Sequence, residues 1–239
     1  MYSRLSLLAI FLLALGSPAF AAKPAPLRVL FVGNSLTYTN DLPAMVTRIA
    51  ALDHRRLETR TVAQPNYSLA DHLQSRAFRA VLQERWDFVV LQQGPSSLPE
   101  SRAQLIHDAR TIADLLHQRS RATIALLMVW PPRARAHSWD RVIGSYTEAA
   151  SAVDGLLIPA GLYLRQALRN DPTLPLLAED GFHPTTAGTY LAALATYHAI
   201  AGRLPAGCDD PSVARKIAGA SVPLSHSAMK ALVSTIAGD

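Results

Sequence analysis

Two patterns of hydrophobic and polar positions alternate along most of this chain. Short apolar runs rich in Val, Ile and Leu predict buried strands, and longer segments with apolar residues every three or four positions predict helices. The predicted strands are residues 27–32, 57–62, 87–92, 123–130 and 155–161. The predicted helices are residues 42–52, 69–85, 100–119, 139–153 and 186–201.

Buried strands that alternate with helices indicate a parallel sheet covered by helices on both faces. Residues 57–62 are more polar than the other predicted strands, which places them at an edge of the sheet. Residues 209–239 are expected to add one or two short helices, to which the sequence assigns no role. In parallel sheets the ligand site lies beyond the carboxyl ends of the strands, so the residues that follow each strand are where chemistry is expected.

The beginning of the chain has a different pattern. After Arg4, residues 5–15 are apolar, Pro18 breaks the run, and Ala19-Phe20-Ala21 fits the small-x-small site of signal peptidase. This predicts a signal peptide over residues 1–21, cleaved after Ala21 or Ala22, and a single exported domain over residues 22–239 that is periplasmic or secreted. The apolar run is shorter than the roughly 20 residues of a membrane span, so an uncleaved anchor is the less favoured alternative.

Composition narrows the classes of function. A chain with 49% hydrophobic and 17% charged residues is globular rather than disordered. The net charge is +5, but no run of like charges suggests a nucleic-acid-binding tail. Cys208 is the only cysteine, so an internal disulfide is excluded. The sequence contains no metal-binding spacing, phosphate loop or dinucleotide motif, and no cofactor is expected.

Two short motifs suggest catalysis. The first predicted strand runs into "GNSLT", where Ser35 would be exposed beside amides of a helix start that can stabilise an oxyanion. A serine hydroxyl needs a base, and "DGFHP" places Asp180 and His183 on a loop just before a helix. That spacing lets the carboxylate hold one imidazole nitrogen and leaves the other as a general base. Each motif alone also fits a residue that merely caps a turn.

Together, "GNSLT" and "DGFHPTTAGTYLA" resemble the SGNH (GDSL-like) hydrolases, and in particular the branch whose first motif reads GNSxT. The resemblance extends over about residues 27–205. It implies a flavodoxin-like three-layer α/β/α sandwich with a mainly parallel sheet of about five strands. It also implies a triad in which Ser35 is the nucleophile, His183 the base and Asp180 its orienting partner, with no cofactor.

The same resemblance implies an oxyanion hole made of the nucleophile's amide, a backbone amide from a second motif and an Asn side chain from a third. Pro65 and Asn66 stand where the second motif has glycines. The amide of Asn66 is the expected donor, because Asn tolerates unusual backbone angles. The third-motif Asn is missing, which leaves Gln92, Gln93 and Ser96 as alternatives. A Gln amide can donate as an Asn amide does. Gln92 is favoured, because the "LQ" at this strand end resembles the form of the GNSxT branch.

Other residues near predicted strand ends are weaker candidates. Tyr38, Tyr67 and Trp130 are predicted to wall a substrate pocket, with a core or loop position as the alternative for each. His72 is a rival base, although a histidine bonded to the backbone is the favoured interpretation. His198 lies on the apolar stripe of its helix and is interpreted as a core residue.

The sequence therefore predicts an exported serine esterase or deacylase that acts on a small-molecule or glycan ester, with a short acyl group such as acetyl favoured. Neither nucleic acid nor stable membrane insertion after signal cleavage is expected. Two alternatives remain: a non-catalytic glycan-binding protein on the same fold, and an acyltransferase that passes the acyl group to a sugar hydroxyl.

Overall fold

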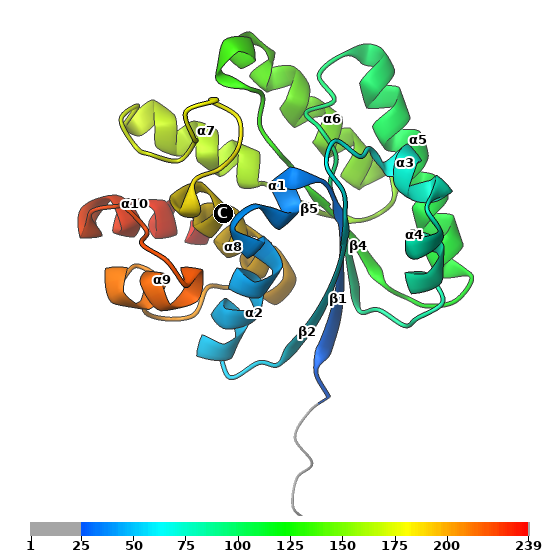
Figure 1. The fold of residues 1–239 in the computed structure, drawn as a ribbon, viewed down its shortest axis with the longest axis horizontal. Coiled ribbons are helices and arrows are strands. Elements are labelled where there is room, and N and C mark those ends of the chain that lie inside the picture. Colours follow the sequence, from blue (N-terminus) through cyan, green and yellow to red (C-terminus); the bar gives the residue numbers. More distant parts are fainter. Residues whose placement is uncertain (1–24, 239) are drawn as a thin grey trace, which may run out of the picture.

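A five-stranded sheet forms the centre of the molecule (Figure 1). The computed structural model describes residues 25–238, and the predicted signal peptide lies outside the described residues. All strand pairs are parallel, in the order β2-β1-β3-β4-β5. The strands are β1 (Leu27–Gly33), β2 (Leu57–Ala63), β3 (Phe88–Leu91), β4 (Thr123–Leu127) and β5 (Leu156–Ile158). The predicted fold class is confirmed, and the polar strand β2 lies at an edge as expected.

Helices cover both faces of the sheet (Figure 1). On one face, α2 (Leu42–Leu52) packs against α8 (Thr186–Ala201). On the other face, α5 (Pro99–His117) packs against α6 (Trp139–Ala152). The stripe predicted for the helix at residues 100–119 is confirmed: Leu105, Ala109, Ile112 and Leu116 are all buried.

Helix α8 is buried on all sides, because further helices cover its outer surface. Residues 187–197 of this helix are all buried. Three helices pack against it from outside the sheet: α7 (Ala160–Asn170), α9 (Pro211–Ala218) and α10 (His226–Ala237). The C-terminal segment thus forms two helices, and its structural role is to cover α8. His198, near the end of α8, is only half-buried.

The structure departs from the predicted elements in two places. The single helix expected at residues 69–85 is split into α3 (Leu69–Gln74) and α4 (Arg76–Val81). Ser75 separates them, because its extended backbone ends α3 and its side chain accepts from the amide of Phe78 to cap α4. Helix α7 was not predicted, since Pro159 and Gly161 resemble the end of a strand. Gly161 is required there because a Cβ atom would lie 2.2 Å from the carbonyl oxygen of Val129.

The remaining short elements are α1 (Ser35–Tyr38), η1 (Thr39–Asp41) and η2 (Arg133–Ser138). Both α1 and η2 follow strands at the carboxyl edge of the sheet, where a site is expected. Over residues 25–238, no helix combines the length and the apolar character needed to cross a membrane.

Candidate active site

Ser35 lies directly beyond the carboxyl end of β1. Asn34 caps the short helix α1, since its Oδ1 accepts from the amide of Leu36 at 3.2 Å. This turn leaves Ser35 half-buried at the start of α1, with its Oγ 3.0 Å from Nε2 of His183. The two residues are 148 positions apart in the sequence, and the parallel sheet brings them to the same edge.

Asp180 holds the opposite side of the His183 ring. Its Oδ2 lies 2.6 Å from Nδ1 of His183. A carboxylate only accepts hydrogen bonds, so Nδ1 carries the proton and Nε2 of the neutral ring is left to accept from Ser35. The other carboxylate oxygen accepts from the amides of Phe182 at 2.9 Å and His183 at 3.0 Å. The bond to His183, followed by these two amide bonds, lowers the pKa of Asp180 to about 2, so it remains a carboxylate.

The loop that carries Asp180 and His183 is fixed from neighbouring elements. Nε1 of Trp130 donates to the carbonyl of Phe182 at 2.8 Å, and the amide of Arg133 donates to the carbonyl of Gly181 at 2.9 Å. The amide side chain of Asn40 donates to the carbonyl of Pro184 at 3.1 Å, which ties the segment after Ser35 to the loop of the base. Sequence reasoning missed Asn40, because nothing in its local pattern distinguishes it from a turn residue.

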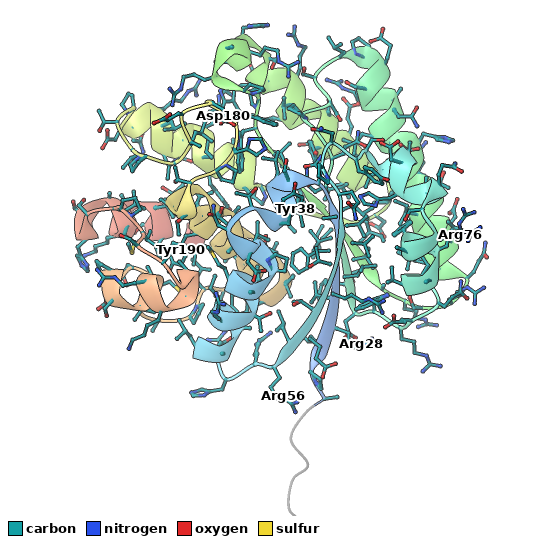
Figure 2. The ribbon with its side chains drawn as sticks, in the orientation of Figure 1. Arg28, Tyr38, Arg56, Arg76, Asp180 and Tyr190 are labelled. Carbon is teal, nitrogen blue, oxygen red and sulfur yellow. The ribbon has the colours of Figure 1, made fainter. Side chains whose placement is uncertain are left out.

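Two of the three aromatic residues predicted to wall the pocket, Trp130 and Tyr38, have different environments. Trp130 is 2% exposed, so the prediction that it walls the pocket is wrong; it supports the loop from within the core. Tyr38 ends α1, one helical turn after Ser35, and is 41% exposed. Figure 2 shows Tyr38 and Asp180 towards the end of the molecule where the strands end. Contact between Tyr38 and substrate stays a prediction.

Two backbone amides near Ser35 are available to hold an oxyanion. Within residues 25–238, no group accepts a hydrogen bond from the amide of Ser35 or of Asn66. Asn66 has a φ of 62°, the left-handed conformation that Asn tolerates. Its loop is tied to the turn of the nucleophile on both sides: Gln64 N donates to Gly33 O, and Asn34 Nδ2 donates to Tyr67 O. This placement is compatible with the expected role of both amides.

The prediction that the side chain of Gln92 is the third oxyanion donor is wrong. Its side chain is fully buried, and its Nε2 donates to Oδ1 of Asn34 at 3.0 Å and to the carbonyl of Gln93 at 2.6 Å. A primary amide has two hydrogens, so none remains for a substrate. The other two alternatives are also bonded internally: Nε2 of Gln93 donates to Oγ of Ser96, whose hydroxyl donates to the carbonyl of Gly94.

His72 is not a base for Ser35. It lies in α3, fully buried, with its Nε2 donating to the carbonyl of Gly33 at 2.7 Å. Its ring packs edge-on against Tyr67 and Phe78. Burial lowers the pKa of His72, in agreement with a neutral ring whose Nδ1 has no partner among the described residues. The interpretation as a histidine bonded to the backbone is therefore confirmed.

A cavity lies at the other end of the sheet, where the strands begin, and does not adjoin the triad. The cavity has a volume of about 700 Å³ and is lined by residues that include Arg28, Trp86 and Arg121. Figure 2 shows Arg28 and Arg56 at that end of the molecule, away from Tyr38 and Asp180. In the part of the chain that the structure describes, no three His, Cys, Asp or Glu side chains are grouped to hold a metal ion.

Comparison with known proteins gives matches among solved structures. No family model and no curated protein match the chain. A proposed SGNH hydrolase from Slackia heliotrinireducens is 27% identical, with a TM-score of 0.64 over 74% of this chain and 100% of that one. A lipase/acylhydrolase from Enterococcus faecalis is 17% identical, with a TM-score of 0.60 over 75% and 98% of the two chains. The acetylxylan esterase Axe2 from Geobacillus stearothermophilus is 16% identical, with a TM-score of 0.59 over 73% and 94%.

The two more distant structures show a shared fold, and the Slackia protein adds a likeness in sequence over its whole length. The chain therefore has the fold of the SGNH hydrolases, and its sequence resembles that of the Slackia protein. Its assignment to the GNSxT branch stays a prediction.

Proposed function

We propose that this protein is an exported serine esterase that works through an acyl-enzyme. The observation that carries the proposal is the continuous chain of contacts from Ser35 Oγ to His183 Nε2 and from His183 Nδ1 to Asp180, at 3.0 and 2.6 Å. These contacts allow a neutral imidazole to accept the serine proton while a carboxylate stabilises the imidazolium that forms.

In the first half of the reaction, Ser35 Oγ bonds to the ester carbonyl carbon as its proton moves to Nε2 of His183. The amides of Ser35 and Asn66 stabilise the negative charge on the carbonyl oxygen. The tetrahedral intermediate then expels the alcohol, which takes the proton from His183, and an acyl-serine ester remains. In the second half, water loses a proton to His183 and attacks the acyl group. Collapse of that intermediate releases the acid and returns the proton to Ser35.

We assign the substrate to short-chain esters, with acetyl groups on glycans as the favoured class. Two exposed aromatic residues lie close in the chain to the proposed oxyanion amides: Tyr38, which ends α1, is 41% exposed, and Tyr67, which follows Asn66, is 37% exposed. A tyrosine ring offers an apolar face and a polar tip, which suits a sugar better than a long acyl chain. Export, to the periplasm or the medium, would bring the enzyme to such substrates.

The test compares the mature protein with Ser35→Ala on aryl esters of increasing acyl length and on acetylated sugars. We expect turnover to peak at acetate and Ser35→Ala to lose at least about 1,000-fold in kcat. If parent and variant are equally inactive on every ester, the proposal of a hydrolase is wrong and a glycan-binding protein is favoured. A peak at long acyl chains would instead refute the short-chain assignment.

Two further measurements separate the finer parts of the proposal. Addition of a sugar acceptor should leave the rate of acetate release unchanged, whereas an acyltransferase would form acetylated sugar at the expense of acetate. The mass of the protein recovered from outside the cytoplasm should correspond to a chain that begins at Ala22 or Lys23. Recovery of the full-length chain inside the cell would contradict export.

A further inference from the structure

Three buried polar side chains surround the turn that carries Ser35. Gln92, Thr37 and Asn34 are 0%, 1% and 7% exposed. Gln92 is bonded through every position of its amide group: Oε1 accepts from the amide of Asn34 at 2.9 Å and from Oγ1 of Thr37 at 2.7 Å, while Nε2 makes the two bonds described above. A fully bonded buried amide holds its neighbours in one arrangement, because each broken bond would leave an unsatisfied polar group.

These bonds fall on both sides of the nucleophile and leave Ser35 itself untouched. Asn34 precedes Ser35 and is bonded through both its main chain and its side chain, and Thr37 follows Ser35 by two residues. Gln92 is in turn anchored to the sheet, since its own amide donates to the carbonyl of Val32 at 2.9 Å. Gln92 therefore holds the turn from the sheet side, while the hydroxyl of Ser35 can still attack a substrate and its amide can still donate a hydrogen bond.

The packing of this cluster also explains the glycine before Asn34. A Cβ atom on Gly33 would lie 2.2 Å from Oγ1 of Thr37 and 2.4 Å from Oε1 of Gln92. Any larger residue would push apart the two atoms whose contact closes the cluster. Gly33, Asn34 and Thr37 of the motif "GNSLT" thus share one structural partner, Gln92 on the neighbouring strand end.

We propose that Gln92 is a positioning residue for Ser35, acting jointly with Thr37 to hold the turn of the nucleophile. This inference rests on the proposed function, because it takes Ser35 as the nucleophile. It differs from the role of an oxyanion donor: Gln92 affects the rate through the placement of Ser35 and does not touch the substrate. The backbone amides of Ser35 and Asn66 then remain the expected oxyanion donors.

A double-mutant cycle distinguishes the two roles of Gln92. The variants are Thr37→Val, Thr37→Ser, Gln92→Met and the combination of Thr37→Val with Gln92→Met. Thr37→Val should lower kcat about tenfold with KM nearly unchanged, and Thr37→Ser, which keeps the hydroxyl, should restore kcat to within about twofold of the parent. In the Gln92→Met background, Thr37→Val should have no further effect, because the contact that it removes is already lost.

Kinetic results of two kinds would overturn the proposal. A full additional loss in the double variant would show that Thr37 and Gln92 act independently. Parent-like kcat in Thr37→Val, together with a loss of at least about 100-fold in Gln92→Met, is the result expected of an oxyanion donor. Failure of the proposed function gives a different result. The parent would then hydrolyse no ester, or Ser35→Ala would hydrolyse esters as fast as the parent.

Amide hydrogen exchange gives a test that does not depend on activity. In Gln92→Met the amide of Asn34 loses its acceptor and should exchange at least about tenfold faster than in the parent, while the amides in the centre of α5 exchange at parent rates. Unchanged exchange at Asn34 would overturn the proposal whatever the kinetics. Faster exchange throughout the molecule would also overturn it, since Gln92 would then support the whole fold rather than this turn.

Discussion

The substitution Trp130→Phe tests whether Trp130 acts on the loop of the base or on the substrate. The change removes Nε1, whose hydrogen bond to the carbonyl of Phe182 is 2.8 Å long, and keeps an aromatic ring in the core. A buried carbonyl left without its donor costs about 1–3 kcal/mol of the free energy of unfolding, and the part-buried carbonyl of Phe182 should cost an amount towards the lower end of that range. The smaller ring adds a cavity cost of the kind seen for other buried large-to-small changes.

The expected effect on catalysis follows from the position of Phe182, which directly precedes His183. If about 1.4 kcal/mol of the lost bond is felt as a less populated productive position of the loop, kcat falls about tenfold. The value of KM should change little, because Trp130 is 2% exposed and does not reach the substrate. Steady-state kinetics on an acetyl ester, combined with urea unfolding, measures both effects.

Trp86→Phe is a matched control. Nε1 of Trp86 donates to the carbonyl of Val81 at 2.9 Å, and Trp86 is 5% exposed at the opposite edge of the sheet. The two variants should therefore lose similar amounts of stability, within about 1 kcal/mol of each other. Only Trp130→Phe should lose activity. A large rise in KM with parent-like kcat in Trp130→Phe, or an equal loss of kcat in Trp86→Phe, would refute this reasoning.

Three further substitutions have distinct expected outcomes. Asp180→Asn keeps an acceptor for the loop amides but removes the charge beside His183, so kcat should fall by about 100-fold or more; a loss under tenfold in steady-state assays would contradict the role of the carboxylate. Asn66→Gly keeps the amide and the positive φ and should retain activity, whereas Asn66→Pro removes the amide and should lose about 100-fold; equal rates in the two would remove this amide from the oxyanion hole. Burial lowers the pKa of His72 below its ordinary value of 6.5, so the unfolded chain binds a proton that the folded protein does not. Stability should then decrease as the pH falls below about 6.5, and His72→Gln, which can still donate to Gly33, should show a smaller decrease in urea unfolding between pH 7.5 and 5. The same pH dependence in parent and variant would contradict this account of His72.

The fold class and the meeting of Ser35, His183 and Asp180 at one edge of the sheet were predictable from the sequence. Two kinds of local signal made this possible: the apolar runs of the strands and the motifs "GNSLT" and "DGFHP". Apolar runs identified four of the strands, and the parallel arrangement that they indicate determines which loops meet. The split of residues 69–85 into two helices was not predictable from periodicity, since it depends on a single cap at Ser75.

The role of Gln92 could not be predicted from the local sequence, for a different reason. A Gln at a strand end can point its amide towards solvent or towards the core, and the sequence does not distinguish these orientations. Its actual environment is set by Asn34 and Thr37, which lie 58 and 55 positions away. Trp130 shows the same limit, since its partner Phe182 is 52 positions away. Residues whose partners are distant in sequence, and not the motif residues themselves, account for most of what the structure added.

Direct trapping of the acyl-enzyme tests the central claim. The parent protein is quenched in acid during turnover of an acetyl ester, digested, and its peptides are analysed by mass spectrometry. The account predicts one acetyl group on the hydroxyl of Ser35, absent from Ser35→Ala treated in the same way. Hydrolysis that proceeds with no acylated Ser35, or with the acetyl group on another side chain, would contradict the claim that Ser35 is the nucleophile.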